Sequence, residues 1–68
     1  MTASGRSIRL AQFLKFVGAV GTGGEAKIRI QASEVTVNGE RETRRGRQLA
    51  PGDQVVIAGE AYEVGALE

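Results

Sequence analysis

The chain has 68 residues, enough for one small domain, and contains neither cysteine nor histidine. This excludes disulfides, zinc sites built from thiolates or imidazoles, and nucleophile pairs of the Ser-His or Cys-His type. No apolar run approaches the roughly 20 residues that span a bilayer, and the first residues lack the apolar segment of a signal peptide. A soluble, cytoplasmic protein without a metal or cofactor is therefore expected.

The formal net charge of +1 hides an uneven distribution of charge along the chain. Residues 1–50 hold all nine lysines and arginines and four acids, a net charge of +5, whereas residues 51–68 hold four acids and no base, a net charge of −4. This asymmetry favours a basic face that binds a polyanion and a separate acidic edge. The alternative is that the charged side chains are merely solvated and interspersed over the surface, with no binding role.

Residues 1–7 are expected to form a flexible leader that the fold does not need. Apolar residues then recur with the i, i+3, i+4, i+7 spacing of one helical stripe, which predicts a helix over about 9–17. Gly18 follows at the position where many helices end. The stripe consists of Leu10, Phe13, Leu14 and Val17.

A second helix is predicted over about 23–32, because Thr22 and Glu25 have the spacing of a capping box. In that motif each side chain accepts a backbone N–H at the helix start. Ile28 points away from the apolar stripe of this helix. Either Ile28 packs on a partner that the pattern does not identify, or the helix is irregular there.

The second half of the chain has the pattern of an antiparallel sheet. Val35 and Val37 alternate with polar residues, and Asn38-Gly39 predicts a two-residue hairpin turn. The expected architecture is a single α+β domain over residues 8–68, with two N-terminal helices packed on one face of a sheet of about four short strands. The remaining elements are a return strand at 40–43, a basic loop at 44–48, a turn at 51–53, and strands at 54–58 and 61–64 around Gly59-Glu60.

Five segments occur in order over residues 8–57: IRLAQFLK, GTGGEAK, IQASEVTVNGE, ETRRGRQL and PGDQVVI. Their combination resembles the S4 RNA-binding domain, and specifically the small free-standing bacterial S4-like proteins. The resemblance implies an S4-like (alpha-L) fold that binds structured RNA, either ribosomal RNA or transfer RNA, with the ribosome or a ribosomal subunit as partner. Ser33 departs from the family, which usually has glycine at this left-handed helix stop, and the departure costs about 1 kcal/mol.

The glycine-rich start of the second helix is one candidate binding site. A helix N-terminus exposes unpaired N–H groups and a partial positive charge, and glycines let a phosphate approach that backbone closely. A lysine and a glutamine one turn further along would then offer a cation and an amide. The alternative is a capped helix with solvated polar residues. The candidate contacts are Thr22, Gly23, Gly24, Lys27 and Gln31.

The densest cationic segment lies between the hairpin and the next turn. Arginine suits phosphate because its planar guanidinium donates two parallel hydrogen bonds. The resemblance implies that this segment stands beside the start of the second helix and forms the other side of a groove for RNA. A solvated loop is the alternative, as it is for two basic residues on the outer face of the first helix. The candidates are Arg41, Arg44, Arg45 and Arg47, extended by Arg9 and Lys15.

Aromatic residues bear on the mode of binding. Phe13 and Phe16 are expected to pack in the core, and Tyr62 lies in the acidic C-terminal hairpin, which leaves no platform for stacking single-stranded bases. The expected function is therefore a non-catalytic, monomeric protein that recognises structured RNA through its phosphates. Two alternatives remain open: an adaptor that docks a protein through the hairpin at 58–68, and DNA in place of RNA. An enzyme is not expected, because no acid pair is fixed by spacing and family members with activity carry it in another domain.

Overall fold

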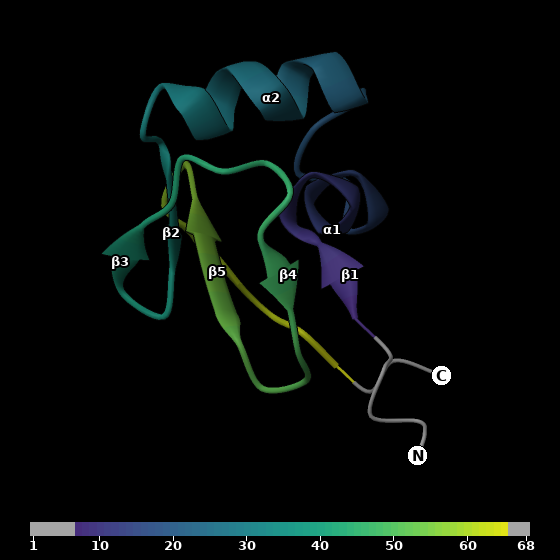
Figure 1. Ribbon diagram of the computed structural model, residues 1–68, viewed down its shortest axis with the longest axis vertical. Helices are drawn as coiled ribbons and strands as arrows, with labels where there is room; N and C mark the ends of the chain where they lie inside the picture. Colours follow the sequence, from purple (N-terminus) through teal and green to yellow (C-terminus); the bar gives the residue numbers. More distant parts are fainter. Residues whose placement is uncertain (1–6, 66–68) are drawn as a thin grey trace.

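Short strands and two helices, joined by turns and loops, form residues 7–65, the part of the chain that the computed structural model describes (Figure 1). The expected leader lies, apart from Ser7, outside the described residues. The elements in chain order are β1 (Ile8–Arg9), α1 (Leu10–Phe16), α2 (Gly23–Gln31), β2 (Val35–Val37), β3 (Glu40–Arg41), β4 (Gln48–Leu49), β5 (Gln54–Ile57) and β6 (Glu60–Glu63).

Four of the strands form one antiparallel sheet in the order β3-β2-β5-β6. Side chains alternate between the faces of a strand, so apolar residues two apart share a face. The register places Val35 opposite Ile57 and Val37 opposite Val55, and all four side chains are buried. The sheet therefore has one apolar face, as the alternating pattern predicted.

The strands β1 and β4 form a separate antiparallel pair that the sequence did not indicate. In this pair Ile8 lies opposite Leu49 and Arg9 lies opposite Gln48. Gln48, expected at the end of a basic loop, is thus the first residue of a strand. The pairing joins the beginning of the domain to the chain that leads into β5.

Both hairpin turns have two residues in the left-handed region. Asn38 and Gly39 have φ angles of 53° and 87°, which confirms the predicted turn. The second turn falls on Ala58 and Gly59, with φ angles of 53° and 80°, one residue earlier than expected. It starts on an alanine, a residue type that rarely adopts this conformation, so nothing in the local pattern indicated the shift.

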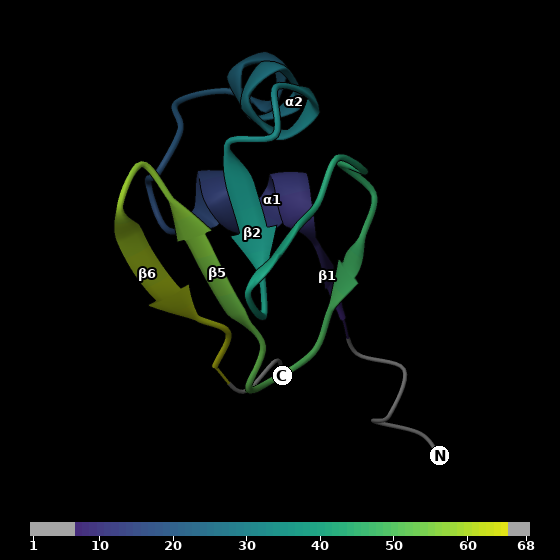
Figure 2. The ribbon, with the colours of Figure 1, turned by 90° about the vertical axis from the view of Figure 1, so that its left-hand side faces the viewer.

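The helices pack on the apolar face and across one end of the sheet. In Figure 2, α1 lies behind β2 and β5, and α2 lies above the end at which β2 begins. The predicted pair of helices and the α+β class are confirmed, although α1 ends at Phe16 and α2 at Gln31 rather than one residue later. The buried apolar core consists of Leu10, Phe13, Leu14, Val20, Ala26, Ile30, Val35, Val37, Leu49, Val55, Ile57 and Val64.

Two large apolar side chains lie outside this core. Phe16 is 81% exposed, so the expectation that it packs inside is wrong; its place in the last turn of α1 turns it away from Leu10 and Leu14. Ile28 is 69% exposed, and α2 continues through it without interruption. Neither a hidden packing partner nor an irregular helix accounts for Ile28.

The end of α2 has the predicted left-handed residue. Ser33 has a φ of 63°, and its N–H donates to the carbonyl oxygen of Ile30 at 3.1 Å. The next N–H, from Glu34, donates to the carbonyl oxygen of Arg29 at 3.1 Å. These bonds close the helix in the manner usual for a glycine at this position.

Candidate nucleic-acid interface

The arginine loop, defined here as residues 44–47, is held against the start of α1 by its own backbone. The N–H of Leu10 donates to the carbonyl oxygen of Arg47 at 2.8 Å, and the N–H of Ala11 donates to that of Arg45 at 3.1 Å. The first N–H groups of a helix lack partners within the helix, and α1 has no acidic residue in its first turn. The carbonyls of the loop therefore cap α1, which fixes the loop backbone while its side chains remain at the surface.

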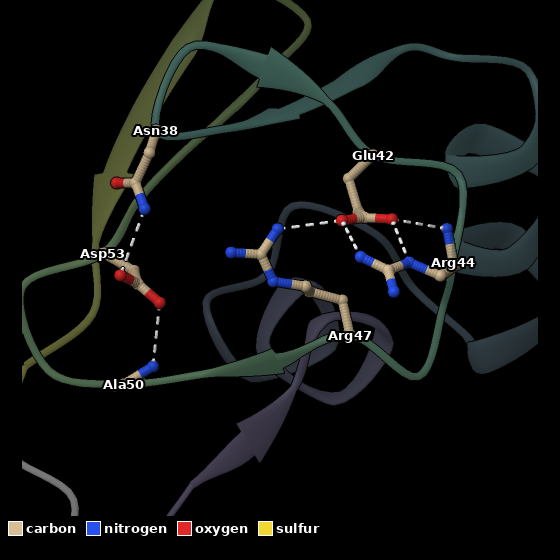
Figure 3. A network of polar contacts seen from close by, with 6 residues as sticks. All are labelled: Asn38, Glu42, Arg44, Arg47, Ala50 and Asp53. Carbon is tan, nitrogen blue, oxygen red and sulfur yellow. Dashed lines mark hydrogen bonds and ion pairs between the residues drawn. The ribbon is translucent and has the colours of Figure 1, made fainter.

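A buried carboxylate organises two of the loop's three arginines. Glu42 is only 6% exposed, because it lies opposite Val35 on the core side of the sheet, where its N–H donates to the carbonyl oxygen of Val35 at 3.0 Å. Its Oε2 accepts from Nε of Arg44 at 2.9 Å, and its Oε1 accepts from Nη2 of the same residue at 3.1 Å. Oε1 also accepts from Nη1 of Arg47 at 2.8 Å (Figure 3).

These hydrogen bonds explain the acidity of Glu42. The donors on Arg44 and Arg47 favour the ionised carboxylate and lower its pKa from 4.5 to about 2, against the opposing effect of burial. The same contact raises the pKa of Arg44 above its ordinary value. At neutral pH Glu42, Arg44 and Arg47 thus form a fully ionised, hydrogen-bonded cluster.

The side chain of Arg44 in this cluster stays largely open to solvent, and that of Arg47 stays partly open. The side chain of Arg44 is 74% exposed and that of Arg47 is 31% exposed. Arg45 is exposed, and no ion pair within residues 7–65 involves it. Three arginines against one carboxylate leave two net positive charges on this small surface.

The start of α2 is already partly satisfied from within. The hydroxyl oxygen of Thr22 accepts from the N–H of Glu25 at 3.1 Å, and Oε1 of Glu25 accepts from the N–H of Gly21 at 2.9 Å. The predicted cap is thus formed, although the carboxylate reaches the residue before Thr22. Gly23 and Gly24 are exposed in the first turn. An anion seated there would lie close to the Glu25 carboxylate, which makes this position less favourable than the glycines alone indicated.

The two flanks of α2 differ in charge. On one flank Nε of Arg29 lies 3.5 Å from Oε2 of Glu25, and its Nη1 lies 3.7 Å from Oε1 of Glu34, so two carboxylates flank its charge. Helix residues advance by about 100° each, which places Lys27 and Gln31 on the flank across the buried stripe from that ion pair. Both residues are exposed. We call this second side the open flank.

Known proteins share this sequence pattern. The family described as S4 domain matches residues 1–65. The chain belongs to the S4 domain family. A protein of Bacillus subtilis (strain 168) described as "Probable ribosome maturation protein RlbA" is 48% identical over 52 residues, which cover 76% of this chain and 73% of the relative.

Within this S4 domain, the structure brings some of the predicted binding residues together. Arg9, at the end of β1, lies opposite Gln48 and thus beside the arginine loop. The expected neighbour of the loop was the start of α2, but its hydrogen bonds go to the start of α1. No hydrogen bond or ion pair within the described part of the S4 domain joins the loop to Thr22 through Gly24.

Two other predicted residues lie apart from the arginine loop. Lys15 is exposed in the last turn of α1, whereas the loop contacts the first turn. Arg41 lies opposite Thr36 in the β2–β3 pair, so its side chain is on the sheet face away from Glu42 and the core. No hydrogen bond or ion pair within residues 7–65 joins the side chain of either residue to the loop.

Glu42 is the residue that the sequence reasoning missed. Its signal was present, since a two-residue turn at Asn38-Gly39 fixes the hairpin register and thereby sets Glu42 opposite Val35. A carboxylate at a core-facing position, followed by arginines two and five residues later, indicates a buried ion-pair cluster.

The described part of the S4 domain contains neither a clustered metal site nor a helix that could cross a membrane. No cluster of three or more acidic side chains within residues 7–65 is arranged to hold a metal ion. Neither described helix has the length and apolar character that crossing a membrane requires.

Proposed function

We propose that this S4 domain is a non-catalytic RNA-binding protein that holds structured RNA through phosphate contacts. The binding face comprises the arginine loop, Arg9, and the open flank of α2. The observation that carries the proposal is the exposed arginine cluster on a loop whose backbone is fixed against α1. Guanidinium groups donate paired hydrogen bonds to phosphate oxygens. Because the loop backbone is already fixed, little entropy is lost in ordering it when RNA binds.

The arrangement of α2 supports a continuous face. The linker that joins α1 to α2, residues 17–22, passes on the left of α2 in Figure 2, and the arginine loop lies on the right. Glu25 bonds to Gly21 in that linker, so the paired flank of α2 faces left. The open flank, with Lys27 and Gln31, consequently faces the side on which the arginine loop lies.

The nature of the target follows from what this face offers. Phosphate contacts position a nucleic acid without reading its bases, and double-stranded RNA is recognised mainly by shape and backbone. The Bacillus subtilis relative is described as a probable ribosome maturation protein, which favours ribosomal or ribosome-associated RNA as the target. A monomer acting in the cytoplasm completes the proposal.

The experiment is a salt titration of binding to a fluorescein-labelled RNA stem-loop. If about four to six phosphates are neutralised, log K against log salt falls with a slope of about −3 to −5. Replacing Arg44, Arg45 and Arg47 together by alanine weakens binding and flattens the slope by about one unit for each phosphate that is no longer neutralised. An unchanged affinity would refute the proposal.

Two controls accompany the titration. Arg29→Ala removes the same kind of side chain from the paired flank of α2, and we expect it to leave RNA affinity unchanged. Competition with a DNA stem-loop of matched sequence tests the preference for RNA.

The adaptor alternative can be tested without truncating the domain. Deleting residues 58–68 would remove β6 and the buried Val64, so charge reversal is the better perturbation. Glu60→Lys with Glu63→Lys changes two exposed side chains of the edge strand and would abolish protein capture if the acidic hairpin were the docking surface.

A further inference from the structure

Glu42 has a position that charge attraction to RNA does not explain. A carboxylate inside a cationic binding face lowers the local potential and should weaken the attraction of a polyanion. Burying it also removes it from water, which is costly unless its hydrogen bonds are complete. An apolar residue opposite Val35 would avoid both disadvantages.

The contacts of Glu42 act directly on the arginines that face solvent. Arg44 uses Nε and Nη2 in a side-on contact with both carboxylate oxygens, and its own backbone N–H donates to Oε2 at 3.0 Å. This fixes the plane of the guanidinium in a side chain that is still 74% exposed. Arg47 meets the same carboxylate through Nη1 at 2.8 Å, which leaves Nε and Nη2 for another acceptor.

We propose that Glu42 is a positioning residue of the RNA-binding face. Its carboxylate holds the guanidinium groups of Arg44 and Arg47 in the orientation in which they donate hydrogen bonds to phosphate. This inference rests on the proposed function. Glu42 acts through the arginines and does not touch the RNA. Its benefit is the ordering of two long side chains before the RNA arrives, and this outweighs the loss of one positive charge.

The proposal predicts the sign of an effect. Glu42→Gln removes a negative charge, so charge attraction alone would tighten RNA binding. Loss of positioning weakens RNA binding instead, because both arginine side chains must then be ordered on binding. This ordering alone lowers the RNA affinity by about fivefold or more, and the removed negative charge offsets part of that loss. We expect Glu42→Gln to bind the RNA stem-loop about threefold or more weakly than the wild type, with a salt slope that is not reduced.

A matched control lies two residues away. Glu40 is exposed on β3 and forms no hydrogen bond or ion pair through its side chain within residues 7–65. Glu40→Gln changes the net charge equally, and we expect it to bind RNA as tightly as the wild type or more tightly. Thermal unfolding of each variant identifies a temperature at which all are folded, and binding is compared there, which separates positioning from a purely structural role.

A second pair of variants keeps the test decisive if Glu42→Gln does not fold. Arg44→Lys retains the charge of an exposed side chain but cannot make the side-on contact with Glu42. Arg45→Lys makes the same exchange at a side chain that has no ion pair within residues 7–65. We expect Arg44→Lys to lose clearly more RNA affinity than Arg45→Lys.

The outcomes distinguish this inference from the proposed function. If Glu42→Gln binds as tightly as Glu40→Gln, or if the two lysine variants lose equal affinity, Glu42 does not position the arginines. The function itself fails only if the triple alanine variant of the arginine loop still binds like the wild type. A triple variant that loses binding beside a Glu42→Gln variant that gains it would overturn the positioning role alone.

Discussion

Acid should destabilise the domain through Glu42, and the structure gives the size and the pH range of the effect. The pKa of Glu42 falls from an ordinary value of 4.5 to about 2 in the folded state. A carboxyl with a lowered folded-state pKa contributes stability that is present above pH 4.5 and is lost as the pH falls toward 2. This lowering of the pKa corresponds to at most about 3 kcal/mol.

The real contribution is smaller, because solvent screens a pair whose arginine is mostly exposed. We therefore expect Glu42 to contribute about 1–2 kcal/mol to the free energy of unfolding above pH 5. Glutamine cannot ionise, so the Glu42→Gln variant lacks this contribution at every pH. The difference in unfolding free energy between the wild type and the variant should shrink by about 1–2 kcal/mol between pH 6 and about pH 2.5.

Urea unfolding followed by circular dichroism at several pH values measures this difference. Asp53 also has a lowered pKa, caused first by the N–H of Ala50 and then by the side chain of Asn38, so both proteins lose some stability in acid. That loss is common to both and cancels in the comparison. A difference between wild type and variant that is the same at pH 6 and at pH 2.5 would refute the role assigned to the Glu42 cluster.

Three further variants test other parts of the structure. Ser33→Gly should raise the free energy of unfolding by about 0.5–1 kcal/mol, since φ is 63° there; a decrease measured by denaturant titration would show that the serine is not strained. Asn38→Ala should cost about 1–3 kcal/mol, because the side chain bonds to Asp53 at 3.1 Å and accepts from the N–H of Gln54 at 2.9 Å; a neutral result would mean that these bonds add nothing. Phe16→Ser should change the free energy of unfolding by no more than about 0.5 kcal/mol and so leave the melting temperature nearly unchanged; a large drop in melting temperature would show that Phe16 packs in solution.

Much of the fold could be predicted because local patterns and tertiary structure agree. The apolar stripe of α1, the cap at Thr22 and the turn at Asn38-Gly39 each depend on residues close together in sequence, and each was placed correctly. The same local patterns also predicted the order of the main elements, two helices followed by short strands. Only the ends of elements moved, by one or two residues, where helices and strands fray into turns.

The β1–β4 pairing and the neighbour of the arginine loop could not be predicted in the same way. Two-residue strands carry no alternation of apolar and polar residues, so nothing in Ile8–Arg9 or Gln48–Leu49 indicates a partner. The loop docks on α1 through carbonyl oxygens, which every residue type possesses. Such contacts leave no trace in composition or spacing.

The residue types of the candidate site could be proposed from the sequence, whereas their arrangement in space could not. Charge density pointed to the arginines, and Arg9 does lie beside the loop. Phe16 was misjudged because a stripe of spacing three and four does not decide which residues at its edge are covered. Covering them depends on the length of the neighbouring elements, and within residues 7–65 nothing covers the outer side of the last turn of α1.

The arginine loop docks on α1 through its backbone, so this docking does not depend on which side chains the docking residues carry. The two carbonyl oxygens that receive the helix N–H groups belong to Arg45 and Arg47, and a carbonyl is the same whichever side chain it carries. Position 45 can therefore be exchanged while the docking of the loop persists. The loop backbone thus stays fixed while one exposed side chain is varied, by evolution or by an engineer. Such a change can adjust the affinity of the domain for nucleic acid without altering the fold.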